Sequence, residues 1–455
     1  MLARNAGWDV LALPVRRGGA LQEIDGPFFD ILMTKEKLGK KKEIANMTII
    51  HTSDWHLGAK LHEQDRAEDQ AAFLSDLRAL MQSHGAEVLL ISGDVFDLRQ
   101  PASSAQSLYY DFLAAMDECP TCKKVIVTAG NHDSASLLAA SGLALKRIGV
   151  EVVSRASEDV SKEIIVLRGS EGKPELVVAA VPFMNDGELY NFARAAGVEA
   201  ETTKEKLAAG FKAHYASAIA AARQIAKGAP IVVTGHCVVS GAMVSDKPSE
   251  RGRETGGLES YQGDAFDGAD YVALGHLHIP QFVKGFSNVA YSGSPLPMSF
   301  AESGKIKQVN LISFHGEPGA WNVEVKALDL PSYTSFEILE GSTDAVRDAL
   351  LELKASNPEK IYVSVRVTEG NGELAPFWSE IDSIAQNTGI RILVKENARP
   401  RAAVGSGIAA ASEKTLSVMT PLEVATLRIN EESDLTEEER AEYVAMVREA
   451  IGGIA

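Results

Sequence analysis

The sequence lacks the features that mark secreted, membrane-spanning and ATP-binding proteins. Only three of its 455 residues are cysteines, too few for a disulfide framework, which indicates the reducing cytoplasm. No stretch approaches the roughly eighteen consecutive apolar residues that cross a membrane, and the N-terminus lacks the small-residue cleavage site of a secretory signal. The phosphate-binding pattern G-x-x-x-x-G-K-S/T is also absent, so any ATP dependence has to come from a partner chain.

Basic residues are in the minority. The chain has 45 Lys and Arg against 62 Asp and Glu, a formal net charge of −17. This balance argues against a protein that coats DNA by charge alone, because non-specific binding rests on Lys and Arg. It does not exclude a nuclease, because bound divalent ions reverse the local sign of an acidic site.

The pattern of apolar residues divides the chain into five regions. Residues 1–46 hold no sustained period, and we expect an extension that is disordered or not native. Residues 47–330 alternate strands with helices, which predicts an α/β domain with a layered core. A β-α-β-α-β pattern over 331–398 predicts a small second domain, and the Ala/Gly/Ser-rich segment 399–412 reads as a linker. Two capping boxes then predict helices in 413–455 whose apolar face needs a partner to cover it.

Side chains suited to metal binding follow five of the predicted strands. The strands end in IIHTSDWHLG, ISGDVFD, VTAGNHD, IVVTGHC and YVALGHLH. Ligands of α/β sheets gather at the carboxyl ends of the strands, so we expect these side chains to meet there. A turn aspartate or a hydrogen-bonded core histidine is the alternative at each single position, whereas the whole set favours a metal site. The residues are Asp54, His56, Asp94, Asp97, Asn131, His132, Asp133, His236, His276 and His278.

The donors of this set are carboxylates, one carboxamide and imidazoles, with no thiolate. They are too many for one ion and suit two ions that share a bridging carboxylate. Oxygen and nitrogen donors of this kind favour Mn²⁺, Fe²⁺ or Zn²⁺ over iron–sulfur clusters or structural zinc. Two ions about 3.5–4 Å apart stabilise both the attacking and the leaving oxygen in phosphoryl transfer. The residues therefore predict metal-dependent phosphoester hydrolysis.

The motifs D-x-H, G-D-x-x-D, G-N-H-D, G-H and G-H-x-H, in this order, resemble those of the calcineurin-like metallophosphoesterases. The stretches HTSDWHLG, GDVFD, AGNHDS, ADYVALGHLH and YSGSPLPMSF are similar to the SbcD family of bacterial nuclease subunits. The resemblance runs from Met47 to the C-terminus. It implies a layered α/β fold, a β-sandwich flanked by helices, with a small α+β capping domain and C-terminal helices. It also implies a homodimer, and an SbcC-like SMC-type ATPase that docks on 413–455.

The resemblance further implies a role for each motif residue. One divalent ion, most simply Mn²⁺, would be held by Asp54, His56, Asp94 and His278. Asp94 would bridge to a second ion held by Asn131, His236 and His276. His132 would protonate or stabilise the leaving oxygen, and Asp97 would orient its imidazole. For Asp133 we expect a structural role in the turn.

We therefore expect a two-metal DNA nuclease subunit, an exonuclease on duplex ends and an endonuclease on hairpins, acting in DNA repair and recombination. It would work in the cytoplasm at the nucleoid, with no membrane partner. One alternative is a stand-alone phosphodiesterase for small substrates, against which the capping domain and terminal helices argue. Another is a non-catalytic DNA-end tether, against which His132 beside a full ligand set argues.

Three further features remain open. The CPTC pair at 119–122 is expected to be two loop thiols. The loop 240–261 either holds a DNA backbone through its basic residues or is a solvated surface. Helices predicted at 103–118 and 134–147 carry apolar residues that form either a dimer face or core. These residues are Leu108, Leu113, Leu138 and Leu145.

Overall fold

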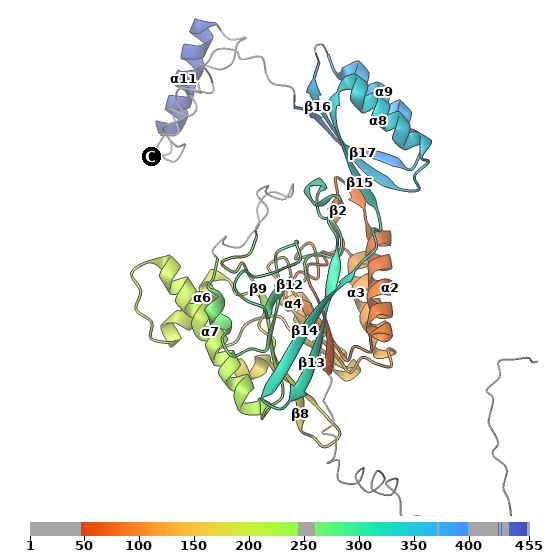
Figure 1. Cartoon of the computed structure of the whole chain (residues 1–455). Helices are drawn as coiled ribbons and strands as arrows, with labels where there is room; N and C mark the ends of the chain where they lie inside the picture. Colours follow the sequence, from red (N-terminus) through yellow and green to blue (C-terminus); the bar gives the residue numbers. More distant parts are fainter. Residues whose placement is uncertain are drawn as a thin grey trace, which may run out of the picture. The chain divides into compact units, whose positions relative to one another are not determined.

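The computed structural model describes residues 47–243, 260–370, 373–398 and 436–452, with Thr426 and Ile429. The predicted extension 1–46, the linker 399–412, most of 413–435 and the basic residues of the loop 240–261 lie outside the described residues. The described chain forms two compact units (Figure 1). The first comprises Asp65–Leu296, Ile306–Pro331 and the described chain before Leu61; the second comprises Leu61–Gln64, Pro297–Lys305 and the described chain from Ser332 onward.

Two six-stranded sheets form the centre of the first unit. The first sheet has the order β14-β13-β1-β4-β5-β6, with bounds Ala320–Asp329, Gln308–Glu317, Met47–Thr52, Val88–Ser92, Lys124–Thr128 and Val150–Val153. The second has the order β11-β12-β10-β9-β8-β7, with bounds Gln281–Phe282, Val289–Tyr291, Tyr271–Gly275, Ile231–His236, Pro174–Ala179 and Ile164–Arg168. The inner strands of each sheet are parallel. Antiparallel pairs close both edges of the second sheet and the β13–β14 edge of the first, whereas β6 at the other edge of the first sheet is parallel to β5.

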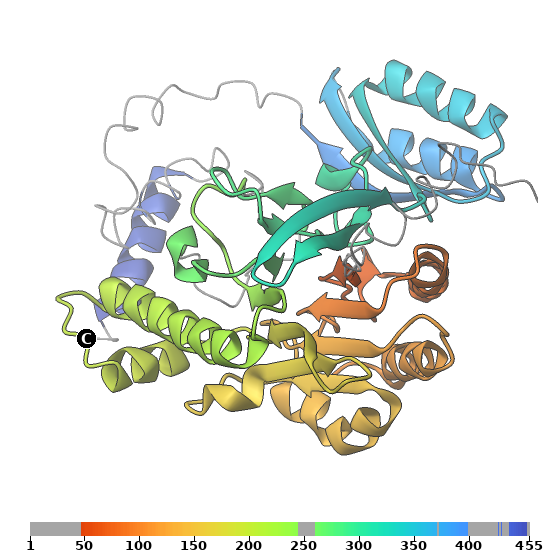
Figure 2. The same cartoon turned by 60° about the horizontal axis from the view of Figure 1, so that its bottom comes forward.

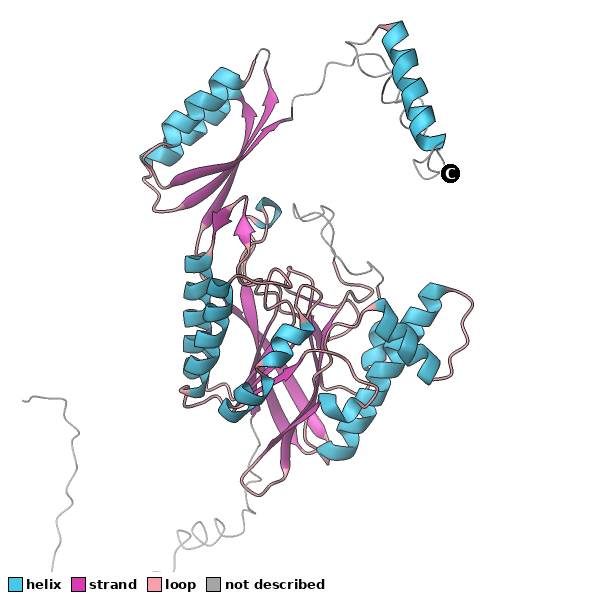
Figure 3. Ribbon diagram, turned by 180° about the vertical axis from the view of Figure 1, so that it is seen from behind, coloured by secondary structure: helices cyan, strands magenta, loops and turns pink. Residues whose placement is uncertain are grey.

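The two sheets face each other across an apolar layer. Ile49, Leu90 and Phe314 of the first sheet belong to one buried cluster with Val178 and Tyr271 of the second. The strands read as continuous apolar runs because their outer faces are also covered, by helices. Figure 3 shows the strands of this unit with helices on both sides. The predicted layered α/β fold, a β-sandwich flanked by helices, is confirmed.

Helices α2 (Ala67–Ser83) and α3 (Ser103–Asp117) lie side by side next to the first sheet (Figure 1). Helices α6 (Asp186–Ala195) and α7 (Thr203–Ala226) cover the outer face of the second sheet (Figure 2). Both α6 and α7 begin with a reciprocal capping box, which satisfies two otherwise unpaired main-chain N–H groups. None of the helices in the described ranges is long and apolar enough to span a membrane.

The second unit holds a three-stranded parallel sheet. Its strands β15 (Ser335–Ser342), β16 (Ile361–Glu369) and β17 (Ile390–Asn397) alternate with α8 (Thr343–Ala355) and α9 (Ala375–Ala385). This is the predicted β-α-β-α-β order.

The chain's last described helix is α11 (Glu437–Gly452). Minor elements are the strands β2 (Lys60–Leu61) and β3 (Gln64–Asp65) and the 3₁₀ turns η2 (Val160–Glu163), η3 (Gly263–Phe266) and η4 (Phe300–Glu302).

The structure corrects two sequence predictions. The helix predicted over 134–147 is wrong as a single helix, because the chain breaks at Ser141 into α4 (Ala135–Ala140), α5 (Gly142–Leu145) and the turn η1 (Lys146–Ile148). Serine followed by glycine is unfavourable inside a helix. The prediction also missed β6, α6 and the β13–β14 hairpin. Of the apolar residues left open on these helices, three are core rather than surface: Leu113, Leu138 and Leu145.

The thiols of the CPTC pair form no disulfide, and the segment joins α3 to β5. This arrangement agrees with the expectation of two loop thiols.

The second unit has a core of its own, so it should respond to mutation separately. Ile381 on α9 is fully buried in that core. We expect Ile381→Ala to lower the free energy of unfolding by about 2–5 kcal/mol, through lost burial and the cavity left behind. Differential scanning calorimetry should show one of two transitions moving down. Ser379→Ala, at an exposed site on the same helix, is the control; equal shifts of both transitions would contradict the prediction.

Candidate metal centre

The predicted ligands lie at the carboxyl ends of strands from both sheets. In the first sheet, Thr52 of β1 pairs with Ile91 of β4, and Ser92 of β4 pairs with Thr128 of β5. In the second sheet, His236 of β9 pairs with Gly275 of β10. Because these parallel strands end in register, their exit loops meet at one edge of the sandwich.

The first loop turns three neighbouring residues in two directions. The indole of Trp55 is buried and packs edge-to-face on Phe73 of α2 and Phe112 of α3, with ring centroids 5.7 and 5.4 Å away. Its Nε1 donates to the hydroxyl of Thr52 at 3.0 Å. Trp55 packs against the helices, whereas the side chains of its neighbours Asp54 and His56 lie in the cluster with His278. Trp55 is therefore a positioning residue for the D-x-H motif.

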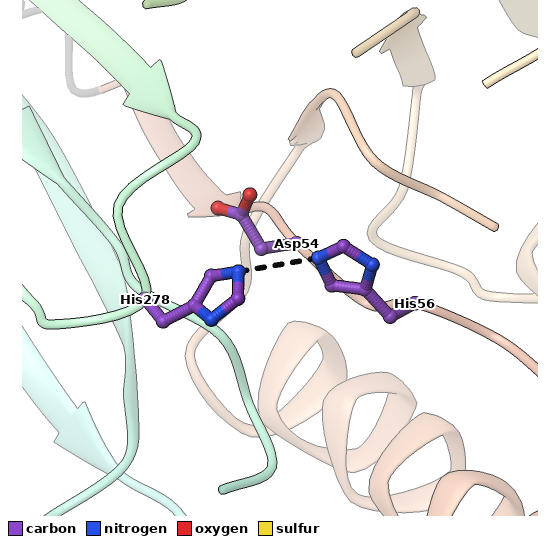
Figure 4. A group of neighbouring side chains, drawn as sticks. All are labelled: Asp54, His56 and His278. Carbon is purple, nitrogen blue, oxygen red and sulfur yellow. Dashed lines mark hydrogen bonds between the residues drawn. The ribbon is translucent and has the colours of Figure 1, made fainter. Parts of the chain in front are cut away.

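One cluster of side chains consists of Asp54, His56 and His278. Their donor atoms lie within 4.8 Å of one another, and Nε2 of His56 is 3.2 Å from Nε2 of His278 (Figure 4). Asp54 is fully buried, and its Oδ1 accepts the main-chain N–H of His276 at 2.9 Å. A carboxylate and two imidazole nitrogens converge on one point in this cluster.

A second cluster is centred on the carboxamide of Asn131. Its Oδ1 lies 3.0 Å from Nε2 of His236 and 3.1 Å from Nδ1 of His276. Nδ1 of His236 lies 2.9 Å from the main-chain oxygen of Ser92. When the imidazole is neutral, donation from Nδ1–H to this carbonyl fixes the tautomer and turns the lone pair of Nε2 toward the cluster.

Asp94 lies between the two clusters. Its Oδ2 is 3.3 Å from Nε2 of His236 and 3.7 Å from Nε2 of His56, so one oxygen faces an imidazole from each cluster. Its Oδ1 accepts the main-chain N–H of His132 at 2.9 Å. This is the arrangement that a bridging carboxylate requires, and its role as a ligand stays a prediction.

Two glycines make this approach possible. A Cβ on Gly130 would lie 2.1 Å from Oδ1 of Asp94, and one on Gly93 would lie 2.2 Å from Nδ1 of His236. Gly93 also has φ of +88°, a conformation that other residues adopt at a cost. Any side chain at either position would push Asp94 or His236 out of place.

The backbone itself is strained at the site. Four of the predicted ligands have positive φ although none is glycine: Asp54 at 53°, His56 at 45°, Asp94 at 50° and His276 at 94°. Each such residue costs about 1–3 kcal/mol and persists only when the surrounding structure holds it there. Concentration of this strain on the two clusters marks them as a functional site.

His132 is held by a main-chain atom. Its Nδ1 lies 2.9 Å from the carbonyl oxygen of Asp97. The Asp97 carboxylate is close as well: one of its oxygens and a ring nitrogen of each of His56 and His132 lie within 4.8 Å of one another, with Oδ1 3.6 Å from Nδ1 of His56. Asp97 is therefore next to His132, as the sequence predicted, through both its carbonyl and its carboxylate, and its role in orienting the imidazole stays a prediction. The charge of Asp97 therefore lies beside both imidazoles.

Asp133 stabilises the loops, as expected. Its carboxylate accepts main-chain N–H groups of Val95 at 3.2 Å, Phe96 at 2.9 Å and Gly130 at 2.9 Å. Burial, helped by the charge of Asp94, raises the pKa of Asp133 to about 6 against these hydrogen bonds. The residue ties the loop after β4 to the loop after β5.

Two further positioning residues carry no motif signal in the sequence. Gln70 of α2 donates from Nε2 to the carbonyl of His56 at 3.1 Å and accepts from the N–H of Gly58 at 3.0 Å. Lys307, which is buried and directly precedes β13, donates from Nζ to the carbonyl of His278 at 3.3 Å. Only the folded chain brings these two residues to the loops they hold.

The charges of the site are strongly coupled. Burial by itself would raise the pKa of Asp94, but the imidazoles of His236, His56 and His132 outweigh it and hold that pKa far below its ordinary range. Burial would lower the pKa of His236, yet the Asp94 carboxylate raises it to about 9. Burial and the neighbouring His236 lower the pKa of His276 to about 4.

The donor set fits two divalent ions. It offers carboxylate, carboxamide and imidazole donors in two groups that share Asp94, a mixture that suits metals of borderline hardness. The thiol of Cys237 follows His236 directly, but burial raises its pKa and keeps it protonated. The site is therefore suited to oxygen and nitrogen coordination.

Metal binding at neutral pH should release a proton from His236. Because its pKa without metal is about 9, the imidazole is protonated at pH 7 and must become neutral to act as a ligand. We expect metal affinity to rise with pH up to about 9 and then to level off. Calorimetric titration of the metal-free chain with Mn²⁺, in two buffers of different ionisation enthalpy, measures the proton directly. A binding enthalpy independent of the buffer would contradict the prediction.

Comparison with known proteins shows which family has this sequence pattern. The model of the calcineurin-like phosphoesterase family matches residues 47–280. The chain is 30% identical over 404 residues to the D component of the nuclease SbcCD from Escherichia coli strain K12, covering 88% of this chain and 96% of that protein. It is 31% identical to the protein of the same name in Rhodobacter capsulatus, covering 78% and 90%. The Bacillus subtilis protein of that name is 31% identical, covering 60% and 68%.

The family match spans all five motifs, and the relatives extend the similarity through the second unit. The chain therefore belongs to the calcineurin-like phosphoesterase family and, within it, to the family of the SbcD components of SbcCD nucleases.

Proposed function

We propose that this chain is the nuclease subunit of an SbcCD-type complex and hydrolyses phosphodiester bonds of DNA with two divalent metal ions. The observation that carries the proposal is the position of Asp94, whose Oδ2 faces imidazoles of both clusters. The name of the relatives supports the substrate, because each is a component of the nuclease SbcCD.

The residues divide between the two ions. The first ion is assigned to Asp54, His56, Asp94 and His278. The second is assigned to Asp94, Asn131, His236 and His276. When bound, two such ions polarise phosphoryl oxygens and lower the pKa of water near neutrality. The protein supplies an edge at which the ligands are already brought together by strand register and buried loops.

His132 is assigned the role of proton donor to the leaving oxygen. Its ring stands edge-on to His56, with centroids 5.0 Å apart. Because Nδ1 is engaged with the carbonyl of Asp97, the proton available to substrate is carried by Nε2. His132 is half-buried, which leaves this edge of the ring within reach of a bound phosphodiester.

We assign Mn²⁺ to both positions. The site mixes hard carboxylate and carboxamide oxygens with softer imidazole nitrogens, and Mn²⁺ accepts both. The site residues are tested together with this assignment in the cleavage experiment below.

The ATPase partner is assigned to the C-terminal helices predicted in 413–455. On α11, Tyr443 and Met446 are 48% and 60% exposed and lie three residues apart, which puts them on one face of the helix. An SMC-type ATPase subunit of the SbcC kind would cover them. This partner would also supply the ATP site that the sequence of this chain lacks. DNA as substrate then places the complex at the nucleoid in the cytoplasm.

A homodimer is proposed through the short helices after β5. Leu143 on α5 is 87% exposed, although its neighbours Leu138 and Leu145 are buried in the core. An exposed leucine of this kind is readily covered by a second copy of the chain.

Cleavage should depend on His132 and Asp94 in different ways. We expect Asp94→Ala to lose cleavage together with metal binding, because both ions lose a ligand. His132→Ala should keep both ions and lose about 10²–10⁴-fold in kcat, the usual contribution of a general acid. The assay uses the full chain with Mn²⁺ and hairpin-ended duplex DNA, with bis-p-nitrophenyl phosphate as a small diester.

The controls separate the rival functions. Chelation by EDTA should abolish cleavage, and Mg²⁺ and Zn²⁺ are compared with Mn²⁺. Turnover of the small diester alone, with and without the ATPase partner, would favour the stand-alone phosphodiesterase. Bound metal without turnover of either substrate would favour a tether of DNA ends.

The dimer is tested at Leu143. Full burial of a leucine contributes about 1.5–3 kcal/mol, so Leu143→Ala should weaken dimerisation about 10- to 100-fold. Sedimentation equilibrium measures the dissociation constant. Leu351→Ala, at the half-exposed leucine of α8, is the matched control, and equal effects of both changes would exclude the α5 interface.

A further inference from the structure

A polar cleft opens beside the second cluster of the metal centre. Its volume is about 280 Å³, several times the roughly 30 Å³ that one water molecule occupies in the liquid. Its walls come from the loops that follow β4, β5 and β6 and from the segment that leads into α6. None of the sequence motifs except G-N-H-D contributes to it.

Two arginines line the cleft. Arg99 follows the G-D-x-x-D motif and is exposed, and within the described ranges no carboxylate pairs with it. Arg155 follows β6 and is 71% exposed, with Nε 3.7 Å from Oε1 of Glu188. The other oxygen of Glu188 accepts the N–H of Asn185 at 3.0 Å, in the capping box of α6. Glu188 therefore lies next to Arg155 alone, and its single negative charge does not neutralise the two positive charges of Arg99 and Arg155.

Hydroxyl groups complete the lining. Ser134, Ser136 and Ser154 line the same cleft, and the hydroxyls of Ser134 and Ser136 lie 3.1 Å apart. The remaining acid of the cleft, Asp133, has its carboxylate engaged by three main-chain N–H groups. Two guanidinium groups and three hydroxyls are donors that suit the oxygens of a phosphate.

The cleft is continuous with the metal centre. Gly130 and Asn131 line it, and Oδ1 of Asn131 is the atom that faces His236 and His276. A group in the cleft is thus next to the position assigned to the second ion. DNA carries its phosphates at regular spacing, so a strand whose scissile phosphate lies on the ions has to pass a neighbouring phosphate over an adjacent surface.

We propose that this cleft binds the phosphate next to the scissile one in the DNA substrate, through Arg99 and Arg155. The proposal rests on the nuclease function proposed above. It explains how a chain with a net charge of −17 can hold a polyanion at the site of reaction: positive charge is needed only beside the metal ions.

The test compares DNA with a diester too small to reach the cleft. In Arg99→Ala and Arg155→Ala, we expect KM for hairpin-ended duplex DNA to rise about eightfold each at 0.1 M salt. One neutralised phosphate contributes about 0.9 to the slope of log K against log salt, which is about eightfold in affinity between 0.1 M and 1 M salt, and we expect loss of either arginine to disrupt this one contact. Turnover of bis-p-nitrophenyl phosphate should stay within about twofold, because its single phosphate occupies the metal centre.

A matched control removes the same charge elsewhere. Arg168 lies at the end of β7, where it pairs with the first residue of β8 and hence with the end of the sheet opposite the metal centre. Arg168→Ala should leave both KM values and the salt slope unchanged. DNA affinity is also measured by fluorescence anisotropy with Ca²⁺ in place of Mn²⁺, which does not require cleavage.

Each outcome decides between the two proposals. Unchanged DNA binding and cleavage in both arginine variants would overturn the cleft while leaving the nuclease intact. Equal losses on DNA and on the small diester would also overturn it, because the arginines would then support the metal centre itself. If the unaltered chain turns over the small diester but neither binds nor cleaves DNA, the nuclease function and the cleft both fall.

Discussion

The rest of the structure depends on the buried charge of Asp94. A carboxylate with 2% of its surface exposed is tolerable only where positive charge and hydrogen-bond donors surround it. The imidazoles of His56 and His236 approach it from separate strands, and the N–H of His132 holds its second oxygen. Packing of two sheets face to face brings these groups to one edge. The apolar layer holds the two sheets together, and the same packing brings the polar ends of their strands to one edge.

Strain and packing are linked at this edge. The four predicted ligands with positive φ cost several kcal/mol together, at about 1–3 kcal/mol each. The loops that carry them are held from outside by Trp55 between two helices and by the side chains of Gln70 and Lys307. The core therefore stabilises conformations that the loops would not adopt alone. Such a site is organised before any ion or substrate arrives.

Much of this could be predicted from the sequence, and the remainder could not for physical reasons. The strands that end at Asp54, Asp94 and His236 were found because long apolar runs identify buried parallel strands. The β13–β14 hairpin was missed because β14 is not an apolar run: exposed polar residues alternate with the partly buried Trp321, Val323 and Val325. The contact between Nδ1 of His132 and the main-chain carbonyl of residue 97 could not be predicted, because every residue has such a carbonyl and the amino-acid type at that position does not reveal its use. Lys307 lies 29 residues after His278 in the sequence, and only folding brings it to the carbonyl of that residue.

Because His132 contacts the main-chain carbonyl of residue 97, this contact does not depend on which side chain that residue carries. Any amino acid with the same backbone course at position 97 presents the same carbonyl, so the tautomer of His132 survives a change of side chain there. The Asp97 carboxylate lies beside the rings of both His56 and His132. A substitution at position 97 therefore changes the charge beside these imidazoles and leaves the main-chain contact to His132 in place.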